Sequence, residues 1–311
     1  MKVCVLGAGS LGSAMGGALA KAGHEVHFVG RAAHMDAVNR GGLVMVTAAG
    51  EETVHLHGHV TAAGIGTCDL VIVLCKTFDT KEVMVQAGDL IGPDTVVMSL
   101  QNGLGAEDVL CECVGAEHVI GGKTYIGGML LEPGRVQATF PGKDTIIGEL
   151  DGSVSDRARA IGQAFSDAGM NCIVSDNIMG VIWDKLLVNV ATGAVCGITH
   201  LPYGDLYDEE KLSAAGIAAV REGIAVAKAA GVQLSHDDPE AYFKMAGAGL
   251  PPDFKPSVLQ SLEKLRPTEI DVMNGAVVAQ GAKYGVPTPV NETLVACVKG
   301  IERYIREYKT K

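Results

Sequence analysis

The sequence predicts an α/β domain built on a parallel, doubly wound sheet, followed by an all-α domain. Three observations support this fold class. Apolar strand-like runs alternate with helix-like segments through the first half of the chain. The glycine-rich hexapeptide "GAGSLG" stands where the first such strand meets the first helix. From about Asp176 onward the strand signals disappear, so we expect two domains, residues 1–176 and 177–311.

The first domain is expected to open with a buried strand, a small-residue helix from Leu11 to Lys21 and a second strand. The segments "GLVMV" and "ETVHLHGHV" alternate in the manner of a hairpin at the sheet's edge. Further helices are expected near Met35 to Asn39, in "TKEVMVQAGDL" and in "SDRARAIGQAFSDAG". Strands are expected at "KVCVLGAG", "HEVHFVGR", "DLVIVLCK", "TVVMSLQNG", "RVQATFPG", "DTIIGEL" and "NCIVS".

The second domain is expected to begin with an apolar helix that contains Lys185 and to continue with the helix "EEKLSAAGIAAVREGIAVAKAAG". A Pro-rich connection follows at Pro251 to Pro256. Two more helices are expected around Ser257 to Leu265 and Thr268 to Tyr284. The change of pattern places a helical domain after an α/β domain.

The composition argues against several classes of protein. A chain of 311 residues with 48% hydrophobic residues can bury a sizeable core, and a net charge of −11 argues against a nucleic-acid-binding surface. The chain starts with a strand-like run rather than with the layout of a signal peptide. The longest apolar run, Leu186 to Ile198, is too short to span a bilayer. We therefore expect a cytoplasmic protein with neither membrane nor nucleic acid as a partner.

Eight cysteines raise the question of disulfides or a metal. Cys4, Cys75 and Cys196 lie in apolar runs, and the sequence contains no C-x-x-C pair. Cys111 and Cys113 are too close together and too isolated for a zinc site. We expect all eight cysteines to be reduced.

The segment "HLHGH" contains three histidines at alternate positions. His55, His57 and His59 would share one face of a strand, which is an arrangement that metal ligands can adopt. The sequence shows no acidic or cysteine partner at a matching spacing, and the segment has the pattern of an exposed hairpin. We therefore expect no metal site.

The glycines of "GAGSLG" fit the pattern G-x-G-x-x-G between a strand and a helix. Such glycines permit a tight turn, let the backbone approach a pyrophosphate and allow the helix to pack against the strand. The N-terminus of the helix supplies amide donors and positive potential. The motif predicts that a dinucleotide is bound by Gly7, Ala8, Gly9, Ser10, Leu11 and Gly12.

The end of the second strand bears on which dinucleotide is bound. Folds that prefer NAD place an Asp or Glu there to hold the ribose hydroxyls, whereas this chain has Gly30 followed by Arg31. An arginine can pair with a 2′-phosphate in a charge-assisted contact worth about 1.5 to 3 kcal/mol. The sequence therefore favours NADP(H), with Arg31 as a solvated surface residue being the alternative.

Two polar residues follow further strands of the predicted sheet. Lys76 comes directly after "VIVLC", and Asn102 lies in "SLQNG". Ligands of open α/β sheets bind at the carboxyl ends of the strands, so both residues are placed to reach cofactor or substrate. Either could instead be a turn residue, because Asn102-Gly103 is also a favourable turn dipeptide.

Lys185 and Asn189 are four residues apart in an apolar helix and share one face. A hydride that arrives at a carbonyl carbon leaves charge on the oxygen, which a positioned lysine can stabilise and protonate. Asn189 could bind a carboxylate or hydroxyl of the substrate. The alternative is that Lys185 pairs with Asp184 or with a surface acid.

The segment "RPTEID" contains a second group of polar residues. Thr268 can cap the next helix, with Asp271 at the capping-box position. Glu269 could be an acid that the helix dipole favours in the first turn. Glu269 could equally be a hydrogen-bond partner that orients a substrate near Lys185.

Together these residues resemble the ketopantoate reductase family. The shared features follow one another through the whole chain: "GAGSLG", "LCKT", "QNG", a W-D-K-L-x-x-N helix, S-x-x-Q and "TEID". The combination of K-L-x-x-N with "TEID" is specific beyond a generic Rossmann protein.

The resemblance implies a Rossmann-type NADP-binding domain and an all-α substrate domain similar to the C-terminal domain of 6-phosphogluconate dehydrogenase. It implies the NADPH-dependent reduction of a 2-oxo acid to a 2-hydroxy acid. The expected reaction is the conversion of 2-dehydropantoate (ketopantoate) to pantoate in pantothenate biosynthesis. A homodimer is expected only by this likeness.

The same resemblance implies roles for individual residues. Lys185 would be the proton donor, and Asn102 would touch both cofactor and substrate. Asn189 and Ser257 would bind the substrate, and Glu269 would lie at the nicotinamide and substrate end.

The chain departs from the family pattern at two positions. A second asparagine is usual four residues after the first on the helix, where this chain has Gly193, and another is replaced by Tyr203. These changes favour a bulkier or less polar side chain on the 2-oxo acid. One alternative is therefore a D-2-hydroxyacid dehydrogenase that acts on an aromatic or branched substrate. A second is a dinucleotide sensor without turnover, which the retention of Lys185 and Glu269 argues against.

Overall fold

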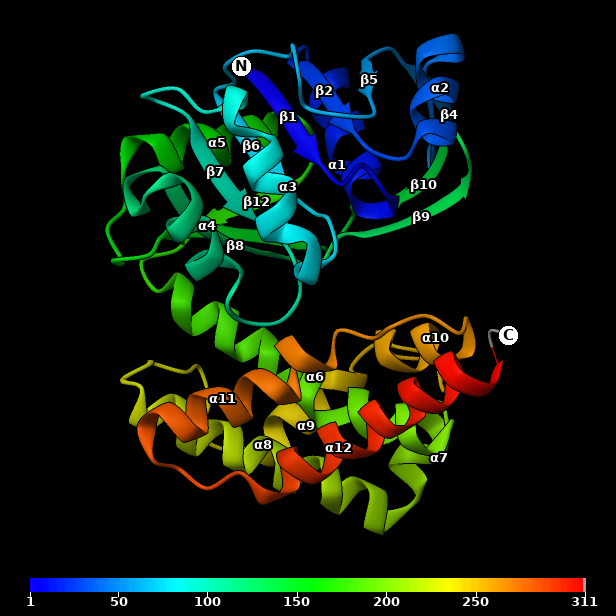
Figure 1. Cartoon of the computed structure of the whole chain (residues 1–311), viewed down its shortest axis with the longest axis vertical. Coiled ribbons are helices and arrows are strands. Elements are labelled where there is room, and N and C mark those ends of the chain that lie inside the picture. The colour runs from blue at the N-terminus through cyan, green and yellow to red at the C-terminus, as the bar shows by residue number, and fades with distance from the viewer. Residues whose placement is uncertain (310–311) are drawn as a thin grey trace. The chain divides into compact units, whose positions relative to one another are not determined.

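The structure, a computed structural model, describes residues 1–309 and divides into two compact units. Unit 1 comprises Met1–Gln101 and Ala106–Ile178, and unit 2 comprises Asn102–Gly105 and the chain from Met179 onward. Unit 1 contains helices and strands, whereas the elements of unit 2 are helices (Figure 1). The predicted fold class is confirmed. The division differs from the predicted one in that Asn102–Gly105 are grouped with the helical unit.

The main sheet of unit 1 has eight strands in the order β12-β11-β8-β7-β6-β1-β2-β5. Neighbouring strands are parallel except for β11, which runs antiparallel to β8. The carboxyl ends of β1, β2, β6, β7 and β8 therefore share one edge. The bounds of the strands are β1 Lys2–Leu6, β2 Glu25–Val29, β5 His57–His59, β6 Leu70–Val73, β7 Val96–Ser99, β8 Val119–Thr124, β11 Asp144–Glu149 and β12 Asn171–Val174.

A second sheet of four strands has the order β4-β3-β10-β9. Its strands are β3 Leu43–Thr47, β4 Gly50–Val54, β9 Gly127–Glu132 and β10 Arg135–Thr139. The prediction of a hairpin at the edge of the main sheet is therefore wrong in part. β3 and β4 do form a hairpin, but they pair with β10 in this small sheet, and only β5 joins the main sheet.

Helices cover both faces of the main sheet, as expected of a doubly wound fold (Figure 1). One hydrophobic cluster joins α1, α2 and α5 to the sheet and includes the inner side of the small sheet. A second cluster joins α3 and α4 to the opposite face. The helices are α1 Ser10–Lys21, α2 Ala32–Gly41, α3 Thr80–Gln86, α4 Ala106–Val114 and α5 Asp156–Asp167.

Unit 2 is a bundle of helices around α6. α6 is long and apolar enough to cross a membrane by length and composition, but 67% of its most apolar window is buried, as in the core helix of a globular unit. The helices are α6 Ile178–Thr199, α7 Tyr203–Asp208, α8 Glu210–Ala229, α9 Pro239–Gly247, α10 Ser257–Glu263, α11 Asn274–Tyr284 and α12 Pro289–Tyr304.

Candidate functional site

The glycine-rich turn after β1 is held in one conformation by the neighbouring strands. The carbonyl of Val29 accepts hydrogen bonds from the amides of Gly7 and Ala8, each at 3.0 Å. Gly7 has φ +95°, and a Cβ there would come within 2.3 Å of the amide nitrogen of Cys75. Only glycine fits this position, because the turn presses against the backbone that follows β6.

The start of α1 fits an anionic group. Gly9 is the N-cap, and among the described residues no side chain caps this helix end. A Cβ on Gly9 would meet nothing within 4 Å, whereas a Cβ on Gly12 would lie 2.7 Å from the carbonyl oxygen of Gly7. The first turn of α1 thus combines amide donors with open space at Gly9, which suits the pyrophosphate of a dinucleotide.

Arg31 lies where the sequence places it, at the carboxyl end of β2. It is exposed and serves as the N-cap residue of α2. The preceding Gly30 donates its amide to the carbonyl of His59 at 3.0 Å, which fixes the turn between β2 and α2. The guanidinium is therefore carried by an ordered turn beside the glycine-rich loop of the neighbouring strand β1.

A buried histidine that the sequence analysis did not select supports this region. The Nδ1 atom of His34 accepts a hydrogen bond from the amide of Gly134 at 2.9 Å, so Nε2 carries the proton and donates to Ser13 Oγ at 2.8 Å. His34 thereby ties α2 to α1 and to the turn of the β9–β10 hairpin. Burial lowers the pKa of His34, which favours the neutral ring that these two bonds require.

The loops after β6 and β7 are joined by a buried glutamine. The side-chain amide of Gln101 donates to the carbonyl of Cys75 at 2.8 Å and to Thr80 Oγ1 at 2.9 Å. Cys75 and Gln101 immediately precede Lys76 and Asn102. Gln101 therefore fixes the backbone on which both predicted site residues stand, although its position in "QNG" was the only signal for it.

The segment Asn102–Gly105 packs within unit 2. The amide of Leu104 donates to the carbonyl of Val272 at 2.9 Å, and Gly103 has φ +87°. The turn interpretation of Asn102-Gly103 is thus correct, and it is compatible with a binding role for Asn102. The contact joins this segment to the one that follows Glu269.

Lys185 and Asn189 are both half-buried on α6. The adjacent Asp184 has its own partners, since its Oδ1 atom accepts hydrogen bonds from the amide of Ser235, at 3.1 Å, and from the hydroxyl of Tyr242. This carboxylate fastens α6 to the start of α9. Lys185 and Asn189 lie one helical turn apart on the same face of α6. They belong to unit 2, which also contains Asn102.

The first turn of α10 packs on the same face of α6. A Cβ built on Gly193 would lie 3.4 Å from a methyl of Val258, and one built on Gly197 would lie 2.7 Å from the other. Positions 189, 193 and 197 follow one another at helical spacing. Ser257, which is exposed at the start of α10, is thereby carried on an element packed against α6 at Gly193 and Gly197.

Tyr203 belongs to an aromatic cluster beside α6. Its hydroxyl shares a hydrogen bond of 2.9 Å with Thr192 Oγ1, and its ring lies 5.0 Å from that of Phe254 and 5.8 Å from that of Tyr207. Burial raises the pKa of Tyr203, so the phenol is neutral at physiological pH. The residue therefore places a buried aromatic ring, with its hydroxyl bonded to α6, in this part of unit 2.

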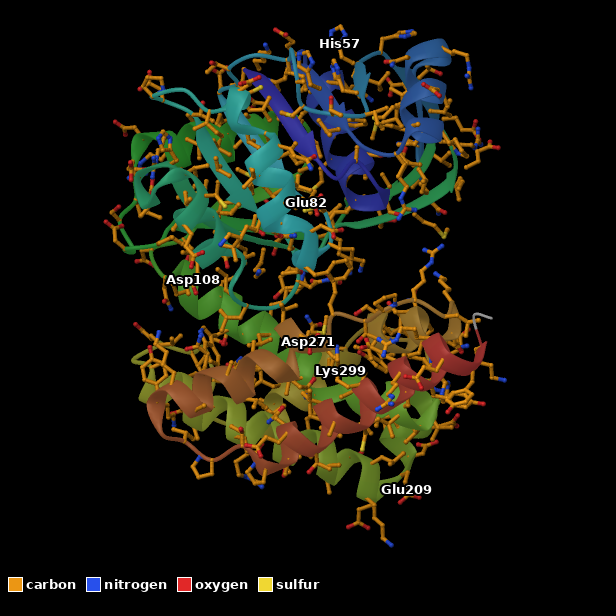
Figure 2. All side chains as sticks on the ribbon, viewed as in Figure 1. His57, Glu82, Asp108, Glu209, Asp271 and Lys299 are labelled. Carbon is orange, nitrogen blue, oxygen red and sulfur yellow. The ribbon has the colours of Figure 1, made fainter. Side chains whose placement is uncertain are left out.

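The segment "TEID" departs from the predicted cap. Thr268 donates its hydroxyl and its amide to Glu302 Oε1 at 2.6 and 2.7 Å, and only a short 3₁₀ turn, Ile270–Val272, follows it. Asp271 does not complete a capping box but pairs with Lys299 at 2.8 Å. Both residues are labelled in Figure 2. The α-helix begins at Asn274, so the predicted helix start at Thr268 is wrong. Glu269 is half-buried.

The histidines do not form the predicted single face. His55 lies between β4 and β5, whereas His57 and His59 on β5 contact His27 on β2, with ring centroids 4.9 and 5.2 Å apart. Over residues 1–309 no cluster of His, Cys, Asp or Glu has a geometry that could hold a metal ion. All eight cysteines are free thiols.

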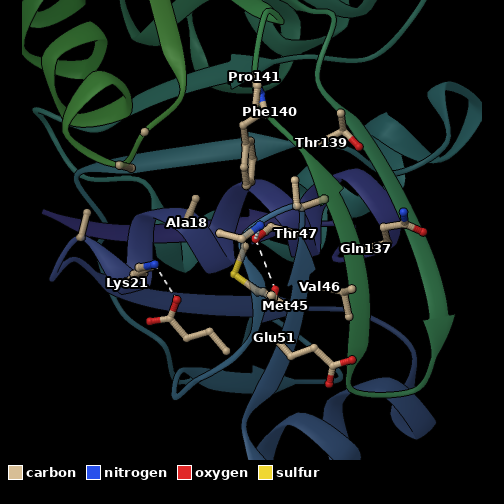
Figure 3. A pocket seen from close by; sticks show the side chains of 18 of the residues that line it. Ala18, Lys21, Met45, Val46, Thr47, Glu51, Gln137, Thr139, Phe140 and Pro141 are labelled. Atoms are coloured by element: carbon tan, nitrogen blue, oxygen red, sulfur yellow. Dashed lines mark hydrogen bonds and ion pairs between the residues drawn. The ribbon is translucent and has the colours of Figure 1, made fainter.

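A cavity of about 970 Å³ lies elsewhere in unit 1 (Figure 3). It is lined by the C-terminal half of α1, the small sheet and the turn before β12, including Met45 and Phe140. Its lining, in the part of the chain that the structure describes, contains none of the predicted cofactor or substrate residues. We therefore do not assign it to the dinucleotide.

Comparison with known proteins gives a consistent result. The family model "Ketopantoate reductase PanE/ApbA" matches residues 3–152, and the model of its C-terminal domain matches residues 177–302. A 2-dehydropantoate 2-reductase of Pyrococcus horikoshii is 31% identical over 303 residues, covering 97% of this chain and 98% of the relative.

Two solved structures extend the comparison. A ketopantoate reductase of the PanE/ApbA family from Ralstonia eutropha JMP134 has a TM-score of 0.90 at 31% identity, covering 99% of this chain and 100% of that one. D-mandelate dehydrogenase, solved with NADH and anilino(oxo)acetate, has a TM-score of 0.88 at 28% identity, covering 98% and 100% of the two chains.

Proposed function

Because this chain belongs to the ketopantoate reductase family, we propose that it reduces 2-dehydropantoate to pantoate with NADPH. The observation that carries the proposal is the half-buried pair Lys185 and Asn189 on one face of α6, with the first turn of α10 packed against the same helix one to two turns further on, at Gly193 and Gly197. An ammonium and an amide side by side suit a 2-oxo acid, which presents a carbonyl and a carboxylate.

The cofactor would be held by unit 1. The amides at the start of α1 suit the pyrophosphate, and Arg31 suits the 2′-phosphate that distinguishes NADPH from NADH. Lys76 and Asn102 follow strands whose carboxyl ends share the edge of the glycine-rich turn. The nicotinamide, when bound, supplies a hydride to the carbonyl carbon of the substrate.

The chain's own residues would supply the proton and the orientation. We assign Lys185 as the proton donor to the carbonyl oxygen, which becomes the hydroxyl group of the 2-hydroxy acid. Asn189 and Ser257 would bind the carboxylate and side chain of the substrate, and Asn102 would contact both ligands. Glu269 would be a hydrogen-bond partner that orients the substrate near Lys185.

A second candidate is a D-2-hydroxyacid dehydrogenase acting on an aromatic or branched 2-oxo acid. It is favoured by Gly193, where a side chain is missing, and by Tyr203 in its aromatic cluster. The structural similarity to D-mandelate dehydrogenase points in the same direction. Both candidates use the same chemistry and differ in the side chain of the substrate.

Steady-state assays with 2-dehydropantoate and phenylglyoxylate, each with NADPH and with NADH, test the proposal. We expect the highest kcat/KM for 2-dehydropantoate with NADPH. A higher kcat/KM for phenylglyoxylate would favour the second candidate. Binding of NADPH without oxidation by any 2-oxo acid would contradict both and indicate a sensor.

A further inference from the structure

Strand β8 carries a lysine whose ammonium is buried in unit 1. Lys123 is 1% exposed, and its Nζ atom donates to the carbonyl of Gln101 at 2.7 Å. The Oε1 atom of Glu107, on the first turn of α4, lies 3.8 Å from the same nitrogen. Within residues 1–309 neither carboxylate oxygen of Glu107 has a hydrogen-bond partner. A buried ion pair with so few hydrogen bonds is a poor source of stability.

The carbonyl that accepts from Lys123 belongs to Gln101, whose side chain links the loops that follow β6 and β7. The side chain of Gln101 is fixed by the hydroxyl of Ser99, which donates to Oε1 at 3.0 Å, and its amide in turn holds the carbonyl of Cys75. The backbone of Cys75 is the surface against which Gly7 packs. One series of contacts therefore runs from the buried ammonium across β7 and β6 to the glycine-rich turn.

We propose that Lys123 is a positioning residue for the dinucleotide, acting through Gln101 on the Cys75 backbone and the glycine-rich turn. The inference rests on the proposed binding of a dinucleotide at that turn. Lys123 itself touches neither ligand nor reacting atoms in this proposal. Its ammonium reaches from β8 to the carbonyl at the end of β7 and supplies that carbonyl with a donor. Burial lowers the pKa of Lys123, and the charge of Glu107 opposes that shift.

The test separates positioning from simple stability. K123M leaves Glu107 as a buried charge without its counter-ion and should lower Tm, whereas K123M/E107M replaces the pair by apolar groups and should recover part of the lost Tm. In both variants the Gln101 carbonyl lacks its donor, so we expect NADPH to bind about tenfold more weakly, measured by fluorescence titration. Recovery of NADPH affinity together with Tm in the double variant would overturn the proposal.

A second measurement tests the route through Gln101. In a Q101M background the amide that holds Cys75 is already gone, so adding K123M should change the Kd of NADPH by less than about twofold. If Q101M and K123M instead raise the Kd of NADPH by factors that multiply in the double variant, the proposed route through Gln101 is wrong. This cycle does not depend on the recovery of Tm in the first pair of variants.

A matched control is available at the opposite end of β7. Thr95 is buried, accepts a hydrogen bond from the amide of Gly92 at 2.8 Å and donates to the carbonyl of Cys68 at 2.7 Å. T95V should lower Tm without changing the Kd of NADPH, and an equal loss of affinity in T95V would overturn the proposal. Wild-type turnover of 2-dehydropantoate is measured in parallel. Its absence would contradict the proposed function and leave the binding comparison valid.

Discussion

Arg31 occupies the position where a dinucleotide fold distinguishes the two nicotinamide cofactors. If its guanidinium pairs with a 2′-phosphate, R31A should weaken NADPH binding about tenfold or more and leave NADH binding nearly unchanged. Arg40, exposed in the last turn of the same helix, provides the control R40A. Equal NADPH affinity in R31A and wild type, by isothermal titration, would rule out the phosphate contact.

Lys185 is the residue on which the proposed chemistry depends most. K185A should lower kcat about a hundredfold or more, because the developing charge on the carbonyl oxygen loses its proton donor. The Kd of NADPH should stay within error, since Lys185 is not among the proposed nucleotide contacts. A K185A variant with wild-type kcat would remove lysine from the mechanism.

At the scale of single residues, the motif predicted the glycine-rich turn, and the structure shows why glycine stands at position 7. A Cβ on Gly7 would collide with the backbone of Cys75, and φ is +95°. The ligand-binding roles of the site residues stay predictions. Gln101, Lys123 and His34 were missed because their partners are backbone groups or distant side chains, which leave no local pattern. The predicted helix start at Thr268 failed because only a 3₁₀ turn, Ile270–Val272, follows it. The Thr268 hydroxyl accepts the amide of Ile270 at 3.3 Å, but both its hydroxyl and its amide donate to Glu302, more than thirty residues away.

At the scale of elements, His34 makes the packing of α2 sensitive to pH. Its pKa is lowered by burial from 6.5, so the folded state binds fewer protons than the unfolded state. The stability that the neutral ring contributes is fully present above pH 6.5 and is lost as the pH falls below that value toward the folded pKa. The free energy of unfolding, measured by urea titration, should therefore decrease as the pH falls through this range.

The variant H34N isolates this contribution. Its free energy of unfolding should depend less on pH than that of the wild type. Burial also lowers the pKa values of His24 and His59, which act in the same direction, so some dependence should remain. An identical pH profile in H34N and wild type would contradict the assignment.

In unit 2, Glu222 on α8 caps the start of α12 from outside. Its carboxylate accepts hydrogen bonds from the amides of Val290 and Asn291, at 2.8 and 3.0 Å, and from the side chain of Asn291 at 2.7 Å. E222A should lower the free energy of unfolding by about 2 kcal/mol, because three donors lose a charged acceptor. The surface variant E240A, which breaks only an exposed pair with Lys244, should change it by less than about 0.5 kcal/mol.

The elements that the sequence predicted are those with long periodic or apolar runs. β8 was missed because "GGKT" interrupts its apolar pattern, and β9 because it begins with two glycines. The small sheet could not be foreseen, since its pairing of β3 with β10 joins residues some ninety positions apart. Such pairing is decided by packing on α1 rather than by local propensity.

At the scale of the whole molecule, the chain divides its proposed tasks between its two units. Unit 1 holds the glycine-rich turn, Arg31 and Lys76, whereas unit 2 holds Asn102, Lys185, Asn189, Ser257 and Glu269. The grouping of Asn102–Gly105 with the helical unit was not predicted. The periodic pattern of the sequence stops at the end of β7, and the loop that follows carries no pattern that indicates which unit it packs on. The fold class and the family followed from motifs distributed over the full length.

The preference for a particular substrate side chain depends on how unit 2 is folded rather than on one residue. Gly193 is buried, and a Cβ there would lie 3.4 Å from a methyl of Val258, while Tyr203 belongs to an aromatic cluster beside α6. We therefore expect G193N/V258A, in which the shortened residue 258 makes space for the added amide, to lower KM for 2-dehydropantoate severalfold with little change in kcat, and V258A alone to leave KM unchanged. An unchanged ratio of kcat/KM for 2-dehydropantoate and phenylglyoxylate would show that Gly193 does not contact the substrate.

The central claim is that this chain transfers a hydride from NADPH to a 2-oxo acid with Lys185 as proton donor. Its most direct test is a single-turnover experiment in which 2-dehydropantoate is mixed with enzyme and bound NADPH, for wild type and K185A side by side. The account predicts loss of the reduced-nicotinamide absorbance and formation of pantoate in the wild type, and a rate about a hundredfold lower in K185A. NADPH that stays bound and reduced in the wild type with 2-dehydropantoate and with phenylglyoxylate would contradict it.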